Sequence, residues 1–208
     1  MRVLAYGERA VLVEVEDLPR VVALVAALRG APVPGTVDLV PSARTVLVRA
    51  DRPIDPTAVS EHISRLDPVP DRSSEPAHGR GPVEIEVEYD GEDLDAVAAA
   101  TDLTRVEVVA AHVGTDWTVA FCGFAPGFAY LIGGDARLKV PRRREPRTRV
   151  PAGTVALADG YSAVYPSASP GGWQLIGHTG ARLWDAERDP PALLLPGTVV
   201  RFRAASQE

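Results

Sequence analysis

Five arginines lie within eight positions of one short segment, between Pro141 and Pro151. The prolines that flank and interrupt this segment prevent a regular helix, so it is predicted to be a loop. A guanidinium group can bind a carboxylate or a phosphate through two parallel hydrogen bonds. Because the whole chain carries a net charge of −6, this local positive charge favours an anion-binding loop. A solvated loop whose arginines pair with the chain's own acidic side chains is the alternative.

A second segment, residues 169–179, places polar side chains beside glycines at the ends of a predicted strand. The candidates there are Gln174, His178 and Thr179. A histidine can carry a proton near neutral pH, so His178 is the candidate for acid–base chemistry. A structural histidine with satisfied hydrogen bonds is the alternative.

A third segment, residues 123–131, carries aromatic side chains between glycines and a proline. The aromatic residues are Phe124, Phe128 and Tyr130. Because glycine lets the backbone approach a neighbouring group closely, the segment predicts a turn whose rings line a ligand or partner site. A buried aromatic turn that closes one end of a barrel is the alternative.

Familiar catalytic motifs are missing from the sequence. The single lysine, Lys139, is followed by Val140, which excludes a phosphate-binding loop of the Gly-x-x-x-x-Gly-Lys-Ser/Thr type. There is no Gly-x-Ser-x-Gly motif, and the histidines show no metal-binding spacing. The single cysteine, Cys122, lies in an apolar run and is predicted to be a core residue. The chain is therefore predicted to be a subunit or a binding module, with no metal or organic cofactor of its own.

The first third of the chain predicts a small α/β unit in the order ββαββα. Asp17 and Asp55 each precede a helix start that has proline in its first turn, as N-capping residues do. Strands and helices of this kind pack as layers, so an α/β sandwich is expected. Residues 67–82 are rich in Pro, Gly and Ser, which favours a domain boundary there. The predicted domains are residues 1–75 and 76–208.

The rest of the chain begins with a strand over Val83–Tyr89 whose outer face carries glutamates. Two short helices follow, and Thr104 with Glu107 fits a capping box at the start of the second. From Trp117 onward, short apolar runs separated by Gly and Pro turns predict a β-barrel or a sandwich, which makes the whole chain α+β. The predicted strands are Trp117–Cys122, Val155–Ala158, Tyr161–Tyr165, Trp173–Ile176, Arg182–Trp184 and Thr198–Arg203, with a hairpin at Asp159-Gly160.

The composition excludes several classes of protein. The 18 glycines and 19 prolines are not periodic, which excludes collagen and global disorder. The net charge of −6 and an isoelectric point near 5.3 disfavour binding to nucleic acid or to acidic membranes. The apolar runs are too short to span a bilayer, and a single cysteine cannot form an internal disulfide. A cytoplasmic protein without nucleic-acid or membrane partners is therefore expected.

The three segments together resemble one family of bacterial proteins. The matching motifs are Gly-Phe-x-Pro-Gly-Phe-x-Tyr-Leu at 123–131, Pro-Arg-x-x-x-Pro-Arg-x-x-Val-Pro-x-Gly-x-Val at 141–155, and Pro-Gly-Gly-Trp-x-x-Ile-Gly-x-Thr at 170–179. They are similar to those of the B subunit of ATP-dependent 5-oxoprolinase, also known as the KipI or allophanate hydrolase subunit 1 family. Ala129 departs from the pattern, because the family often has proline there.

The resemblance implies a cyclophilin-like β-barrel as the C-terminal domain, after the small α/β domain. It also implies an ATP-hydrolysing enzyme subunit that converts 5-oxo-L-proline to L-glutamate only in complex with 5-oxoprolinase A and C subunits. Two other roles stay open: a KipI-like inhibitor of a sensor histidine kinase, and a urea carboxylase or allophanate hydrolase type of subunit. Allophanate hydrolysis is the least expected of these, because no amidase serine/lysine site is present.

Under the oxoprolinase hypothesis, the substrate carboxylate and a phosphorylated intermediate are both anions. Arg144 and Arg147 are then the expected anion contacts. ATP is expected at the level of the complex, because the chain shows no familiar nucleotide motif. The other predicted site residues complete a polar pocket with aromatic walls: Gln174, Thr179, the catalytic His178, Phe128 and Tyr130.

Overall fold

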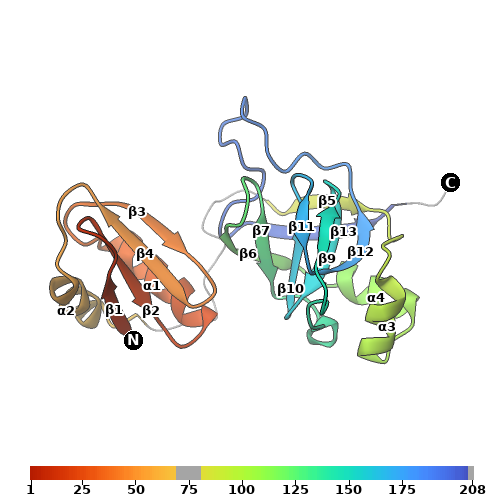
Figure 1. Ribbon diagram of the computed structural model, residues 1–208, viewed down its shortest axis with the longest axis horizontal. Helices are drawn as coiled ribbons and strands as arrows, with labels where there is room; N and C mark the ends of the chain where they lie inside the picture. Colours follow the sequence, from red (N-terminus) through yellow and green to blue (C-terminus); the bar gives the residue numbers. More distant parts are fainter. Residues whose placement is uncertain (69–80, 206–208) are drawn as a thin grey trace. The chain divides into compact units, whose positions relative to one another are not determined.

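The computed structural model of the protein describes residues 1–68 and 81–205, which form two compact units (Figure 1). The segment predicted to contain the boundary, residues 67–82, lies mostly outside the described residues. The domain bounds 1–75 and 76–208 therefore stay a prediction.

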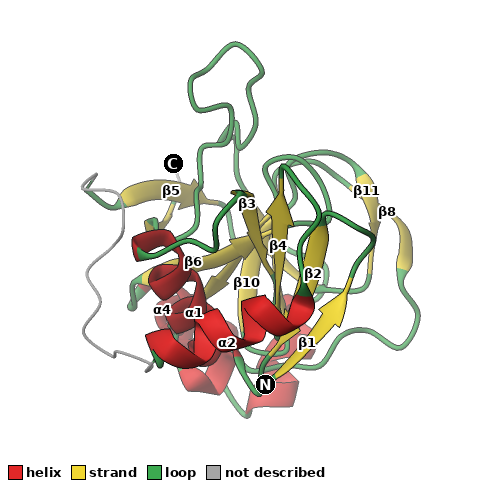
Figure 2. Ribbon diagram, turned by 90° about the vertical axis from the view of Figure 1, so that its left-hand side faces the viewer, coloured by secondary structure: helices red, strands yellow, loops and turns green. Residues whose placement is uncertain are grey.

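The N-terminal unit is an antiparallel sheet of four strands within residues 1–68, with two helices (Figure 2). Across the sheet the order is β1 (Arg2–Ala5), β2 (Ala10–Glu14), β4 (Thr45–Ala50) and β3 (Thr36–Pro41). The helices are α1 (Leu18–Gly30) and α2 (Pro56–Leu66). Val11 and Val13 of β2 share one buried core with Leu24 of α1 and Ile63 of α2, so both helices cover the same face of the sheet.

Capping residues explain where the two helices begin. The carboxylate of Asp17 accepts a hydrogen bond from the backbone N–H of Arg20 at 3.0 Å. That of Asp55 accepts one from the backbone N–H of Thr57 at 2.9 Å. Both bonds satisfy N–H groups that the first helical turn leaves free. The predicted order ββαββα is confirmed.

The C-terminal unit is built on a sheet of seven strands within residues 81–205. Its edge strands meet where Glu88 pairs with His178, which nearly closes the sheet into a barrel. Helices α3 (Leu94–Thr101) and α4 (Arg105–Val113) and a short 3-10 helix, η1 (Ala136–Leu138), accompany it. Across the sheet the strands are β12 (Gln174–His178), β9 (Thr154–Ala158), β10 (Tyr161–Val164), β7 (Ala129–Ile132), β6 (Trp117–Cys122), β13 (Val199–Ala204) and β5 (Val83–Val87).

Two hydrophobic clusters lie on opposite faces of this sheet. Val155 and Leu157 of β9 belong to a cluster that takes residues from strands all around the sheet and from α3 and α4. Ala156 and Ala158 of the same strand belong to a second cluster, rich in aromatic side chains. Because successive strand residues point to opposite faces, the first cluster fills the barrel and the second covers part of its outer wall. A separate two-stranded ribbon joins β8 (Arg147–Val150) to β11 (Ser169–Gly171).

Most local predictions for this unit are confirmed, and one is wrong. The capping box at Thr104 and the hairpin at Asp159-Gly160 are both present. The predicted strand Arg182–Trp184 does not form, because the chain leaves the sheet there as a projecting arm in which Trp184 makes a single bridge to Ala192 (Figure 1).

The single cysteine is half-buried and packs against the barrel core, as predicted. Burial raises the pKa of the Cys122 thiol to about 11, so the group stays protonated at neutral pH. None of the described helices combines the length and the apolar character needed to cross a bilayer.

Candidate functional site

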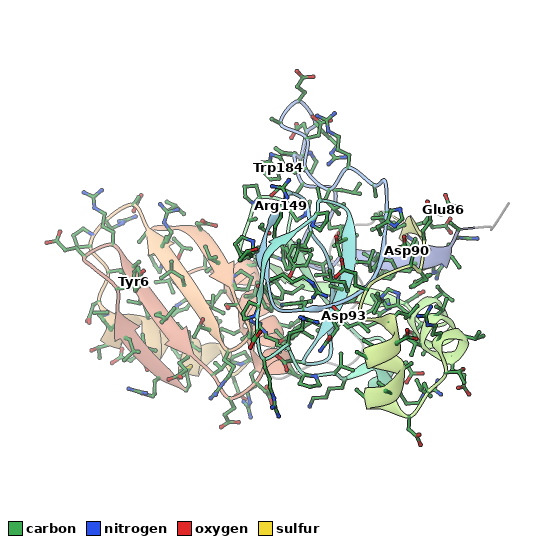
Figure 3. The ribbon with its side chains drawn as sticks, turned by 45° about the vertical axis from the view of Figure 1, so that its right-hand side comes forward. Tyr6, Glu86, Asp90, Asp93, Arg149 and Trp184 are labelled. Carbon is green, nitrogen blue, oxygen red and sulfur yellow. The ribbon has the colours of Figure 1, made fainter. Side chains whose placement is uncertain are left out.

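A buried carboxylate, that of Asp93, organises the arginine-rich segment. Asp93 precedes α3, and its side chain is only 4% exposed. Figure 3 shows it where α3 meets the barrel. Its carboxylate accepts hydrogen bonds from Arg143 Nη1 at 2.7 Å, Arg147 Nη2 at 2.9 Å and the backbone N–H of Leu175 at 2.8 Å. One acidic side chain therefore fixes two guanidinium groups against the first residues of β12.

The protonation state of Asp93 follows from these contacts. Burial would raise the pKa of its carboxyl group, but the hydrogen bonds from Arg147 and Leu175 and the charges of both arginines outweigh it, and the pKa is lowered. The hydrogen bond to Asp93 raises the pKa of Arg147 in turn. Arg147 also reaches Glu92, at 3.1 Å. The cluster is therefore charged throughout the physiological pH range.

The arginine segment runs along the start of β12. The backbone N–H of Arg143 donates to the carbonyl of Gly172 at 2.7 Å. The side-chain amide of Gln174 donates to the carbonyl of Pro141 at 3.0 Å. The guanidinium of Arg142 lies 5.9 Å from the centre of the Trp173 ring, within cation–π range. Arg144, between these contacts, is exposed and forms no ion pair with another described residue.

The two glycines before Trp173 allow this close packing. A Cβ at Gly171 would lie 2.3 Å from the hydroxyl of Tyr165, so no larger residue fits there without displacing the ring. Beneath the turn, Arg143 Nε and Arg147 Nη1 are buried and have no acceptor among the described residues. Buried donors are normally satisfied, so this cluster has more arginine N–H groups than the protein's own acceptors use.

An aromatic cluster lies on the same outer wall, next to Trp173. Phe128 and Tyr130 both lie 5.7 Å from Trp173, ring centre to ring centre. Phe128 is 2% exposed and is a core residue of the cluster, whereas Tyr130 is half-buried and remains partly accessible. The exposed ring of the turn is Phe124. The structure thus brings Phe128 and Tyr130 close to the arginine segment.

The opposite end of β12 carries a different pair. His178 Nδ1 lies 2.8 Å from a carboxylate oxygen of Asp90, and its Nε2 lies 3.6 Å from one of Glu88. The hydrogen bond to Asp90, together with both negative charges, raises the pKa of His178. His178 and Thr179 line an open pocket of about 280 Å³ beside β5. An aspartate that orients a histidine is a recurring arrangement in general acid–base catalysis.

The predicted site residues therefore fall into two groups. Gln174 and His178 are the first and last residues of β12, and four strand intervals amount to about 13 Å. The group at the Gln174 end, called here the arginine end, contains Arg144, Arg147, Gln174, Phe128 and Tyr130. The group at the histidine end contains His178 and Thr179.

Two residues that hold these groups in place, Asp93 and Asp90, escaped prediction from the sequence. Asp93 sits before an apolar helix, so its sequence context suggests only a capping residue. Its partners Arg143 and Arg147 lie 50 and 54 residues away, beyond the reach of any local pattern. Asp90 lies 88 residues from His178 for the same reason. Among the described residues, no group of three or more His, Cys, Asp or Glu side chains could hold a metal ion.

Comparison with known proteins identifies the family. Residues 1–194 match the family described as carboxyltransferase domain, subdomain C and D. The chain belongs to this family. The resemblance seen in the three motifs is thereby confirmed.

Curated proteins with similar sequences carry one shared name. The B subunit of 5-oxoprolinase from Escherichia coli O157:H7 is 50% identical over 123 residues, which are 58% of this chain and 56% of that protein. The protein of the same name from Bacillus subtilis (strain 168) is 43% identical over 129 residues, 61% of this chain and 54% of that protein. The matched region spans just over half the length of these relatives.

Solved structures share the fold. TTHA0988 is 36% identical with a TM-score of 0.74, over 96% of this chain and 41% of that one. PH0987 from Pyrococcus horikoshii is 32% identical with a TM-score of 0.59, over 99% of this chain and 98% of that one. The urea carboxylase of Kluyveromyces lactis has a TM-score of 0.74 over 98% of this chain and 22% of its own, but at 19% identity it supports the fold alone. The predicted α+β class with a C-terminal barrel is confirmed.

Proposed function

We propose that the chain is a subunit of an ATP-dependent 5-oxoprolinase, the enzyme that opens 5-oxo-L-proline to L-glutamate. The names of the curated relatives support this assignment. The observation that carries it in the structure is the Asp93–Arg143–Arg147 cluster, which concentrates positive charge beside the exposed Arg144 and has arginine N–H groups with no acceptor among the described residues. A site of this kind suits a small carboxylate substrate.

The chemistry of lactam opening explains why arginines are needed. The substrate carries a carboxylate, and transfer of the γ-phosphoryl group of ATP to its lactam oxygen adds further negative charge while ADP leaves. Water then adds to the activated carbon, and the ring C–N bond breaks as the ring nitrogen takes up a proton. A second water hydrolyses the resulting acyl phosphate, which releases L-glutamate and inorganic phosphate. Arginines preorganised by Asp93 can stabilise this charge without reorganising during the reaction. In this proposal Arg147 is a fixed wall of the anion site and Arg144 is the group that closes on the ligand.

Partner subunits complete the active site in this proposal. The sequence contains no phosphate-binding loop of the Gly-x-x-x-x-Gly-Lys-Ser/Thr type, so ATP is used at the level of the complex. The partners are the A and C subunits, of which a carboxyltransferase-like chain is the expected direct neighbour. A cytoplasmic location stays a prediction.

His178 has a separate place in this proposal. A five-membered ring is much shorter than the roughly 13 Å between the backbone positions of Gln174 and His178, so in this proposal one bound 5-oxoproline does not occupy both ends of β12. The catalytic role predicted for His178 stays a prediction, and it requires that a second group be bound at the histidine end. The Asp90–His178 pair is chemically competent to move a proton there.

The other candidate functions have less support. Each of the curated relatives described above carries the name of a 5-oxoprolinase subunit, and none of those names mentions a histidine kinase. The likeness to urea carboxylase rests on 19% identity. Neither alternative is favoured by a specific contact in the described residues.

The test is ATP-dependent glutamate formation by the complex of this chain with its A and C subunits. Arg144→Ala should lower kcat/KM for 5-oxoproline by about 10- to 100-fold, mainly through KM, because a charge-assisted hydrogen bond contributes about 1.5–3 kcal/mol. The matched control is Arg137→Ala, an exposed arginine that pairs with Asp135. A complete complex that forms no glutamate, or equal activity in both variants, would contradict the proposal.

A further inference from the structure

Two large aromatic side chains are exposed at one corner of the barrel. Phe124 is 63% exposed and Trp184 is 41% exposed. The turn that carries Phe124 packs against the backbone at Trp184, because a Cβ at Gly127 would lie 2.9 Å from Trp184 Cβ and 3.2 Å from the carbonyl oxygen of Leu183. We call Phe124 and Trp184 the aromatic corner.

Phe124 is held in a conformation that its side chain disfavours. Its φ is +70°, in the left-handed region that suits glycine and strains bulky residues. The turn is fixed by hydrogen bonds from Ala125 N to Gly123 O at 2.8 Å and from Gly123 N to Phe128 O at 3.1 Å. The fold gains little from this residue, since most of the ring faces solvent. A strained, exposed aromatic residue is better explained by binding than by stability.

Trp184 lies at the base of the projecting arm, as Figure 3 shows. The arm is anchored in the barrel core by Leu183 and Leu194, which are 2% and 1% exposed. It is closed by backbone hydrogen bonds from Leu193 N to Leu183 O at 2.9 Å and from Asp185 N to Pro191 O at 3.0 Å. Arg188 donates to the carbonyl of Pro191 from inside the arm, at 2.9 Å. The corner is therefore preformed, which reduces the entropy lost on binding.

The aromatic corner is continuous with the arginine end. The Phe124 ring lies 5.2 Å from that of Phe128 and 6.5 Å from that of Tyr165, centre to centre. The hydroxyl of Tyr165 lies under Gly171, which pairs with Arg147 across the β8–β11 ribbon. A molecule bound at the corner would thus lie within about two side chains of the anion site.

The family match indicates what kind of polypeptide is available to cover the corner. This chain matches subdomains C and D of a carboxyltransferase domain, and in TTHA0988 the matched region is 41% of a longer chain. In that relative, therefore, the same fold is joined to further polypeptide. Arg149 of β8, which is exposed and has no ion-pair partner among the described residues, favours a partner surface that is acidic around an apolar pocket.

We propose that the aromatic corner is the docking surface for the carboxyltransferase-like partner subunit. Phe124 and Trp184 would enter an apolar pocket of the partner that has an acidic rim. The contact brings the partner's residues to the anion site at the arginine end. This inference rests on the proposed function, because it takes the chain to be one subunit of a heteromeric enzyme.

The test measures the dissociation constant between this chain and the purified carboxyltransferase-like subunit of the proposed complex, by biolayer interferometry without substrate. Phe124→Ala and Trp184→Ala should each weaken binding by about 10-fold or more, as truncation of a buried aromatic anchor does. The matched control is Val106→Ala on α4, which is 77% exposed in the intact chain and should bind like the unmodified protein. Dissociation constants within two-fold of each other in all these proteins would overturn the proposal.

Phe124→Gly separates binding from folding. Glycine adopts the positive φ without strain, so the melting temperature of the Phe124→Gly variant should equal or exceed that of the unmodified chain. Its binding to the partner should be weakened as in Phe124→Ala. A Phe124→Gly chain that binds normally would overturn the proposal. The proposal would also be overturned if sedimentation showed that the chain alone forms a dimer and that Phe124→Ala and Trp184→Ala abolish it. The expected binding losses in a complex that makes no glutamate would instead contradict the proposed function and leave the docking surface intact.

Discussion

The two ends of β12 each carry an aspartate bound to a basic side chain, at nearly the same distance. Asp93 meets Arg143 at 2.7 Å and Arg147 at 2.9 Å, and Asp90 meets His178 at 2.8 Å. Solvent makes the difference, because the Asp93 side chain is 4% exposed and that of Asp90 is 64% exposed. A buried pair resists separation of its charges, whereas an exposed pair is screened by water. Distance alone therefore does not tell which pair is structural.

Because of this difference in exposure, the two ends suit different functions. The arginine end is rigid and permanently charged, which suits a site that holds an anion. The histidine end is exposed, and the Asp90 hydrogen bond raises the pKa of its imidazole, which suits proton transfer or a response to pH. Both ends belong to one sequence motif, residues 170–179, so a motif alone does not define a single site.

The largest expected effect separates the two aspartates by stability. Asp93→Ala leaves two guanidinium groups and the N–H of Leu175 without their acceptor, and should lower the free energy of unfolding by about 3–5 kcal/mol. Asp90→Ala removes an exposed pair and should cost less than about 1 kcal/mol. Urea denaturation of both variants at pH 7 measures the difference. Equal losses would remove the distinction between the ends.

A smaller effect is expected from the packing of the glycines. Gly171→Ala places a Cβ 2.3 Å from the Tyr165 hydroxyl, so it should destabilise the chain by about 1–3 kcal/mol, as overpacking does. Gly180→Ala, beyond the histidine end, meets no atom within 4 Å and should change stability little. Thermal unfolding of the Gly171→Ala and Gly180→Ala variants measures the two losses of stability. Equal losses would contradict the claim that the arginine end is packed more tightly.

The smallest expected effect is the pH dependence of the histidine end. The pKa of His178 is raised above 6.5, so its ion pair stabilises the fold below that pH and the stabilisation is lost as pH rises through the folded-state pKa. Asp93 behaves oppositely: its lowered pKa gives stability that is lost only as pH falls below about 4. The free energy of unfolding, measured from about pH 6 to about pH 8, should fall by less than about 1 kcal/mol relative to His178→Gln. If the difference in free energy of unfolding between the two proteins is the same at both ends of this pH range, the exposed pair contributes nothing to stability.

The sequence predicted the elements whose signals are local. The caps at Asp17, Asp55 and Thr104 bind neighbours two or three residues away, so their motifs are complete within one turn. The turn at Asp159-Gly160 is predictable for the same reason, since both residues adopt a positive φ. The strand expected at Arg182–Trp184 did not form. The buried residue of that run, Leu183, instead anchors one end of the projecting arm in the barrel core.

The candidate site was predictable only in part. Its motifs located the arginine segment and the two ends of β12 correctly, but they gave no sign that these ends form two separate groups of residues. Asp93 holds the site together from about 50 residues away. Pairing over such a distance depends on how the barrel closes, which no local pattern contains.

The most direct test compares the two ends in the working enzyme. In the complex with the A and C subunits, kcat/KM for ATP-dependent glutamate formation is measured for Arg144→Ala and His178→Gln under identical conditions. The account predicts that KM for 5-oxoproline, obtained from the same kinetics, rises about 10-fold more in Arg144→Ala than in His178→Gln. A KM that rises in His178→Gln as much as or more than in Arg144→Ala would contradict the assignment of the anion site to the arginine end.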